Sequence, residues 1–296
     1  MLSPGLWLVE ALNKLIPPQA MHDELDQAKL GDREFQDRDY AEAAQVCPQF
    51  GARWDLSGKA VLDVGSGLGG KAAYYAEEGA GSVTAIDLRA YSAGASLALA
   101  SRRELASRIR PLVADAARMP FAGDNFDVIV SINVLEHVKD VRSTLAECKR
   151  VLHPDGLIFL YYPPFYSPWG AHVEGWIDFP WPHLFFSDKT LIEAASRVEN
   201  RRRHNQAYIS PARVDWEHLE RLPDLNRVTM KESLQIIESL DLTIVESRML
   251  PFAWQYLSRK GTLAKTALSV LKWLTHVRPF REWVTTKMAF VLAKRS

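Results

Sequence analysis

Cysteine is the scarcest residue in this sequence. Cys47 and Cys148 are the only two among 296 residues, and neither stands in a metal-ligand spacing. Small domains that depend on disulfides or on a structural zinc ion need more cysteines than this. The sequence therefore excludes such a framework and predicts a protein that works in a reducing compartment.

Long hydrophobic runs are absent too. No uninterrupted apolar stretch reaches the roughly 18 residues needed to span a bilayer. Glu10 and Lys14 interrupt the apolar residues near the start, and no small-residue cleavage site follows them. We therefore expect an amphipathic helix at residues 5–16 and no signal peptide. We expect a cytoplasmic protein, and a peripheral contact with a membrane stays open.

The sequence also carries no net charge. Its 36 basic residues balance 36 acidic ones, which gives no case for a nucleic-acid partner. The charges are unevenly spread, because residues 251–296 hold nine Lys and Arg against one acidic residue, Glu282. Within that segment, residues 261–281 have the pattern of a basic amphipathic helix. Such a helix either packs on the edge of the core or lies on an anionic membrane.

Short apolar runs alternate with helical patterns after residue 57. We expect strands at 60–64, 83–86, 111–113, 126–132, 157–162, 242–247 and 287–293, and helices at 70–78, 91–107, 141–151 and 229–240. This order predicts an α/β fold with a doubly wound, Rossmann-like and mostly parallel sheet. The chain then divides into an N-terminal helical lid (1–56), a Rossmann-like core (57–162), a cap insertion (163–226) and a C-terminal part of the core (227–296).

A glycine-rich turn follows the first predicted strand. Glycines there let the backbone approach a ligand closely at the start of a helix. Gly65, Gly67 and Gly70 match the dinucleotide-binding spacing, whereas Gly65, Gly67 and Gly69 match that of methyltransferases. Asp63 favours the second pattern, because a carboxylate would repel a pyrophosphate and attract a sulfonium cofactor with an amino group.

Polar residues also follow the next three strands. Asp87 ends the second strand, where a carboxylate can accept both hydroxyls of a ribose. Asp115 follows the third strand and suits an adenine amino group, and Asn133 begins the loop after the fourth. Because parallel strands bring their carboxyl ends to one edge, we expect these side chains to line a single site.

Together these motifs resemble the class I S-adenosylmethionine-dependent methyltransferases, in the broad subgroup that includes ubiquinone and menaquinone biosynthesis enzymes. The likeness covers residues 57–162 well, and 227–249 and 286–294 more loosely. It implies a seven-stranded sheet with an antiparallel last strand. The sequence departs from the family pattern at Pro154-Asp155-Gly156, where relatives usually have Pro-Gly-Gly. The residues that it assigns to the cofactor are Asp63, Gly65, Ser66, Gly67, Gly69, Asp87, Leu88, Asp115, Ala116 and Asn133.

The resemblance also implies a reaction. S-adenosylmethionine would be the methyl donor, S-adenosylhomocysteine the product, and the acceptor an oxygen or nitrogen of a small, lipid-like or glycan-linked molecule. Tyr40 would join the cofactor site if the lid folds over it. A base is needed only where the acceptor must lose a proton, and His137, beside the methyl group, is the leading candidate.

The insertion is the expected acceptor site. Eight aromatic residues between positions 165 and 186 form either a small cap core or a pocket for an apolar, aromatic or cationic acceptor. His172 and His183 lie among them and are further catalytic candidates. Nothing in the sequence requires a metal ion.

Two alternatives remain from the sequence. An NAD-dependent oxidoreductase is favoured by Gly70 and disfavoured by Asp63. A non-catalytic partner subunit with the same fold is disfavoured because the acidic positions of the site are intact. A nucleic-acid methyltransferase would need a broader basic surface than this sequence provides.

Overall fold

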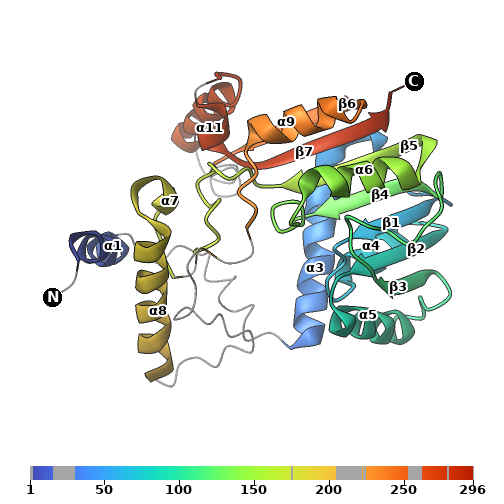
Figure 1. The fold of residues 1–296 in the computed structure, drawn as a ribbon, viewed down its shortest axis with the longest axis horizontal. Coiled ribbons are helices and arrows are strands. Elements are labelled where there is room, and N and C mark those ends of the chain that lie inside the picture. The colour runs from blue at the N-terminus through green and yellow to red at the C-terminus, as the bar shows by residue number, and fades with distance from the viewer. Residues whose placement is uncertain are drawn as a thin grey trace.

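The computed structural model describes residues 3–15, 31–174, 176–204, 222, 225–252, 262–278 and 280–295. Parts of the predicted lid, cap and basic segment, at 16–30, 205–221 and 253–261, lie outside the described residues. A seven-stranded sheet has the order β3-β2-β1-β4-β5-β7-β6 (Figure 1). Strands β1 to β5 pair in parallel, and β7 is antiparallel to both of its neighbours. The predicted fold class and the antiparallel last strand are confirmed.

The strands lie close to their predicted positions. They are β1 (Ala60–Val64), β2 (Ser82–Asp87), β3 (Ile109–Val113), β4 (Phe126–Ile132), β5 (Leu152–Tyr162), β6 (Leu242–Pro251) and β7 (Thr285–Lys294). The central ones read as continuous apolar runs because helices cover both faces of the sheet. β5 begins five residues before its predicted start at 157, because Leu152 already pairs with Phe126 of β4.

The helices of the core are α3 (Asp32–Val46), α4 (Gly70–Glu77), α5 (Ala90–Arg102), α6 (Val141–Val151) and α9 (Met230–Ser239), with the 3-10 helix η1 (Cys47–Arg53). Local signals fix their ends. The Asp140 side chain accepts from the Ser143 amide to cap α6, and Thr229 and Glu232 form a capping box on α9. α5 stops at Arg102 instead of the predicted 107, because Glu104 has a φ of 59° that a helix cannot continue through.

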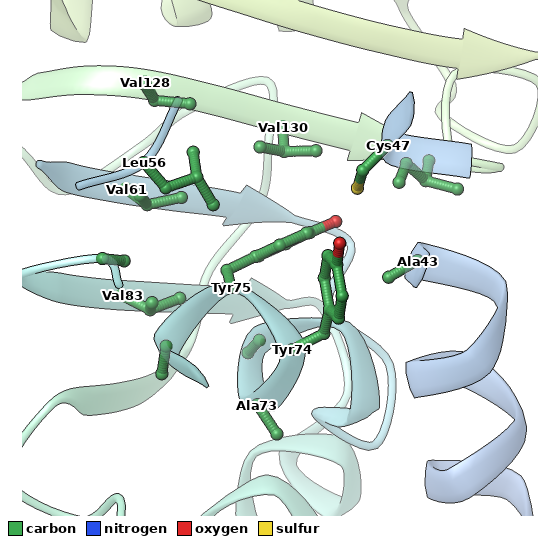
Figure 2. Packing of buried hydrophobic residues seen from close by; sticks show 14 of the residues in the cluster. Ala43, Cys47, Leu56, Val61, Ala73, Tyr74, Tyr75, Val83, Val128 and Val130 are labelled. Carbon is green, nitrogen blue, oxygen red and sulfur yellow. The ribbon is translucent and has the colours of Figure 1, made fainter. Parts of the chain in front are cut away.

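Two hydrophobic clusters lie on opposite faces of the sheet. One joins α3, η1, α4 and α5 to the sheet and includes Cys47, Phe50 and Tyr75, all at most 1% exposed. Figure 2 shows Tyr74 and Tyr75 of α4 pointing toward Cys47 and the strands. The other cluster joins α6 and α9 to the sheet and includes Cys148. Each cysteine is thus a buried core residue.

The cap has a third cluster of its own. It joins α1 (Pro4–Leu15) to α8 (Asp188–His204) through Leu6, Val9 and Leu191, each fully buried (Figure 1). Asn13 of α1 adds a polar contact to another part of the cap, because its side-chain amide donates to the Trp176 carbonyl at 2.8 Å. The predicted lid is therefore divided: α1 packs in the cap, whereas α3 packs on the core.

The described residues contain three further helices. They are α7 (Pro182–Phe185) in the cap, and α11 (Thr262–Leu274) and α12 (Arg281–Val284) before β7. The parts of the chain that the structure describes contain no helix long and apolar enough to cross a membrane.

Candidate functional site

The turn between β1 and α4 is built from glycines with left-handed backbone. Gly65, Gly67 and Gly69 have φ of 72°, 52° and 92°, values that cost little only for glycine. A Cβ on Gly65 would lie 2.4 Å from Val134 Cγ2, so the loop after β4 also requires glycine there. A Cβ on Gly67 would meet nothing closer than 3.6 Å. The turn therefore leaves space beside the Gly67 Cα atom into which a ligand could pack.

The last two glycines serve helix packing. A Cβ on Gly69 would lie 2.3 Å from Ser96 Oγ of α5, and one on Gly70 would lie 2.1 Å from the Gln36 carbonyl oxygen of α3. Gln36 also holds the turn, because its Nε2 donates to the Leu68 carbonyl oxygen at 2.9 Å. Gly70, which made the spacing resemble a dinucleotide site, is explained by the close approach of α3.

Asp63 lies under this turn on β1. Its residue is 1% exposed, and its Oδ2 has no hydrogen-bond partner among the described residues. Burial raises its pKa to about 7, with Lys71 opposing the shift and Asp39 and Asp87 adding to it. A buried carboxylate without a partner is costly unless a ligand completes it. Asp63 thus fits a ligand that brings hydrogen-bond donors and positive charge.

The next two acidic positions lie at the same edge of the sheet. Asp87 Oδ2 accepts from the Gly67 amide at 3.1 Å, and its Oδ1 accepts from the Arg89 amide at 2.9 Å. Leu88 beside it is 69% exposed. β3 ends next to β2, since Val113 pairs with Asp87, and the exposed Asp115 follows it. The structure therefore brings the predicted nucleoside-binding positions together, with Ala116 adjoining them.

Asn133 is held in place by two charged residues that the sequence analysis missed. Its φ is 55°, its Nδ2 donates to Glu42 Oε1 at 2.6 Å, and its Oδ1 accepts from Lys287 Nζ at 2.6 Å. Glu42 is also 3.2 Å from Lys71 Nζ, and that lysine is buried in α4. A lysine among the apolar residues of the first turn of α4 is the signal in the sequence that could have pointed to this network. No local pattern marks Lys287, which reaches the site from β7.

The loop after Asn133 carries a buried acid and an exposed histidine. Glu136 is 4% exposed, and no other described residue donates a hydrogen bond to its carboxylate. Burial raises its pKa, with Lys287 and His137 opposing the shift. The ring of His137 lies 5.1 Å from that of His172, centroid to centroid. The structure thus brings two of the three predicted catalytic histidines together.

Asn226 joins the cap to this loop. Its Nδ2 donates to the carbonyls of Leu135 and Val138 at 2.5 and 2.8 Å, and its amide donates to the Glu136 carbonyl at 2.9 Å. A small cavity of about 10 Å³, close to the space of one water, lies between the loop and the cap. Its lining residues are Glu136, Pro163, Phe165, Gly170, His172, Leu225, Arg227 and Val228.

His172 and His183 lie in the cap. Burial lowers the pKa of His172 to about 3 and that of His183 to about 4, so both imidazoles are neutral near pH 7. The ring of His183 packs on Phe165, 4.9 Å away. With pKa values this low, neither ring is suited to accept a proton as a general base near neutral pH.

Tyr40 points away from the glycine turn. Its hydroxyl donates to Glu77 Oε2 at 2.7 Å, and its ring packs edge-on against Tyr74. Glu77 is the last residue of α4, at the opposite end of that helix from the turn. The structure therefore does not bring Tyr40 together with the other predicted cofactor residues.

The described residues contain no group of three or more His, Cys, Asp or Glu side chains arranged to hold a metal ion. The ionisable groups near the turn instead pair with each other, as Lys71 does with Asp39 at 3.6 Å.

Comparison with known families identifies the core. Residues 62–160 match the model of the methyltransferase domain. The ubiquinone biosynthesis O-methyltransferase of Pseudomonas paraeruginosa is 38% identical over 112 residues, which are 36% of this chain and 46% of that enzyme. The sterol 24-C-methyltransferase of Gibberella zeae is 30% identical over 104 residues, 35% of this chain and 27% of that enzyme. The chain thus matches less than half the length of these relatives.

Solved structures share the fold at low sequence identity. The geranyl diphosphate C-methyltransferase of Streptomyces coelicolor, determined with geranyl diphosphate, Mg²⁺ and S-adenosylhomocysteine, is 14% identical, with a TM-score of 0.52 over 86% of this chain and 78% of that one. The [4+2]-cyclase SpnF is 16% identical, with a TM-score of 0.51 over 88% of this chain and 81% of that one. The matched segment and the strand order together show that the chain contains a class I methyltransferase domain.

Proposed function

Starting from that domain, we propose that the protein transfers a methyl group from S-adenosylmethionine to an oxygen or nitrogen of a small, lipid-like or glycan-linked acceptor. The observation that carries the proposal is the buried carboxylate of Asp63, whose Oδ2 has no hydrogen-bond partner among the described residues, under a turn that leaves free space beside the Gly67 Cα atom. A ligand with an ammonium group and a sulfonium charge suits that carboxylate better than a pyrophosphate does.

The residues at the edge of the sheet fit this cofactor. Asp63 and the turn from Gly65 to Gly69, with Ser66, would hold the methionine part. Asp87 would accept the ribose hydroxyls, and Leu88, Asp115 and Ala116 would flank the adenine. We leave Tyr40 out of this set, since its hydroxyl is engaged by Glu77. The bound cofactor supplies a methyl group already activated by a positively charged sulfur.

The acceptor would lie between the loop at 133–138 and the cap. His137 is exposed there, whereas burial keeps His172 and His183 neutral. His137 would therefore take the proton from an acceptor hydroxyl while the acceptor oxygen bonds to the methyl carbon and the bond from that carbon to sulfur breaks. His172 would act on the position of the His137 ring, 5.1 Å away.

The names of the relatives support a lipid-like acceptor. Ubiquinone, sterol and geranyl diphosphate enzymes are all named for molecules with an apolar, isoprenoid-type part. In this chain the cavity beyond the loop has Phe165, Pro163 and Val228 among its lining residues, but it has room for about one water only. A lipid-like acceptor would therefore have to displace the cap to reach His137.

Binding comes first in the test of this proposal. Calorimetry should show binding of S-adenosylmethionine and S-adenosylhomocysteine and none of NADH. Binding of NADH alone would establish the dinucleotide alternative, and binding of none of the three would overturn the proposal.

Transfer is tested next with labelled S-adenosylmethionine and a panel of prenylated phenols, sterols, glycans and amines. The His137→Gln variant should lose about 100-fold or more in kcat with unchanged cofactor affinity. His153→Gln is the matched control, because His153 is exposed at the opposite, amino end of β5. Equal kcat in wild type and His137→Gln would remove His137 as the base.

A further inference from the structure

Four large apolar side chains are exposed on the segment that runs from α11 into α12. Val270 is 52% exposed, Trp273 64%, Phe280 46% and Trp283 48%. Single exposed apolar residues are ordinary on a soluble protein, but a concentration of them marks a surface that contacts something. Figure 1 shows α11 beyond one end of the sheet, the end at which strand β7 begins.

The same segment is positively charged. Lys272 and Arg278 are exposed, and Arg281 is half-buried. The acidic residue of the segment, Glu282, is turned inward, because its Oε1 accepts from the Tyr166 amide at 3.2 Å. Basic and aromatic side chains therefore alternate at this surface with no exposed carboxylate between residues 270 and 283.

We propose that this surface binds a lipid bilayer that contains anionic lipids. We call it the α11–α12 surface and define it by Val270, Lys272, Trp273, Arg278, Phe280 and Trp283. Tryptophan and phenylalanine insert at the level of the lipid headgroups, and Lys and Arg beside them pair with lipid phosphates. The centre of a protein interface is enriched in aromatic residues and arginine but depleted of lysine, so it is the exposed Lys272, with no exposed carboxylate beside it, that favours the bilayer over a protein partner.

The position of the surface connects it with the cap. Trp181 Nε1 donates to the Trp283 carbonyl at 2.9 Å, and the Phe252 amide donates to the Val284 carbonyl at 2.6 Å. α12 is thus fastened to the segment that carries Phe165 and His172. Contact of α12 with a bilayer would bring the cap to the lipid surface, from which an apolar acceptor could enter. This last step rests on the proposed function, whereas the binding of the bilayer does not.

The test is sedimentation of the full-length protein with vesicles. We expect binding to phosphatidylcholine vesicles that contain phosphatidylglycerol, weakened by salt, and little binding to phosphatidylcholine alone. Trp273→Ser should lower the vesicle affinity by about tenfold, since it removes a large apolar side chain from the headgroup region. Trp7→Ser is the matched control: Trp7 is 62% exposed on α1, outside the α11–α12 surface, and its loss should leave binding unchanged.

Other results would overturn the inference. They are no binding to either kind of vesicle, equal losses in Trp273→Ser and Trp7→Ser, or a change of oligomeric state in Trp273→Ser with vesicle binding intact. Circular dichroism and the melting temperature show whether each variant is folded. Calorimetry with S-adenosylmethionine needs no vesicles, so intact cofactor binding without vesicle binding would refute the surface alone and leave the proposed function standing.

Discussion

The proposed contact of Asp63 with the cofactor predicts that cofactor affinity depends on pH. The pKa of Asp63 is about 7 because burial disfavours the charged form. Below pH 7 the free protein therefore holds a proton there. The ammonium group of S-adenosylmethionine would favour the ionised carboxylate, so binding must release that proton. Affinity should consequently rise with pH up to about 7 and then level off.

The size of the effect follows from the pKa. At pH 5 about 99% of the Asp63 side chains are protonated, and at pH 7 about half are. The affinity should rise by about 50-fold between these values, or about 2.3 kcal/mol. The amino group of the cofactor stays protonated across that window, so the change reports on the protein.

The assay is calorimetric titration at pH 5, 6 and 7 in buffers with different ionisation enthalpies, which also counts the protons released. Asp63→Asn should bind with nearly constant affinity, because it has no proton to lose. Asp127→Asn provides the control, since Asp127 accepts from the Ala60 amide at 2.9 Å at the other end of β1. The reasoning fails if wild-type affinity is flat from pH 5 to 7, or if Asp63→Asn keeps the full dependence.

Three further substitutions test the site. Gly65→Ala should abolish cofactor binding and lower the free energy of unfolding by about 1–3 kcal/mol. The reason is that Gly65 has a φ of 72° and that Val134 occupies the space of the new Cβ. A second change, Val134→Ala, should restore part of the stability, as measured by denaturant titration. Asn226→Ala should cost about 1–3 kcal/mol, since two loop carbonyls lose their donor; an unchanged melting temperature would contradict this. Glu136→Gln should gain stability relative to wild type as pH rises above the ordinary glutamate pKa, and the gain should level off once the raised pKa of Glu136 is passed, because folding disfavours the charged carboxylate; melting curves across pH measure it.

Local patterns predicted the core well because its strands and turns are specified locally. Residues 126–132 form a strand and residues 141–151 a helix, both at the predicted bounds. The apolar run favours a buried strand, and the amphipathic pattern with its N-cap favours a helix. α5 was predicted too long because no glycine or proline follows Arg102. Its end depends on Leu105, 4% exposed, turning into the core, and that contact is made in three dimensions.

The polar network around Asn133 could be predicted only in part. Asn133 itself follows a strand and was expected at the site. Glu42 and Lys287, which hold it, are separated from it by 91 and 154 residues. No periodicity within either segment encodes such pairings. Tyr40 was misleading for a related reason, because a helix placed near a site can present a given side chain in any direction.

The packing of α1 on α8 has a consequence for biosynthesis. Asn13 contacts the carbonyl of Trp176, 163 residues later, and Glu10 contacts Arg201, 191 residues later. Leu6 and Val9, fully buried in the finished protein, leave the ribosome long before the residues that will cover them. At roughly 5–20 residues per second, that interval lasts on the order of 10–40 seconds. During it the apolar side chains of α1 stay uncovered, the kind of segment that chaperones bind, and the sheet waits longer still for β7 at 285–294.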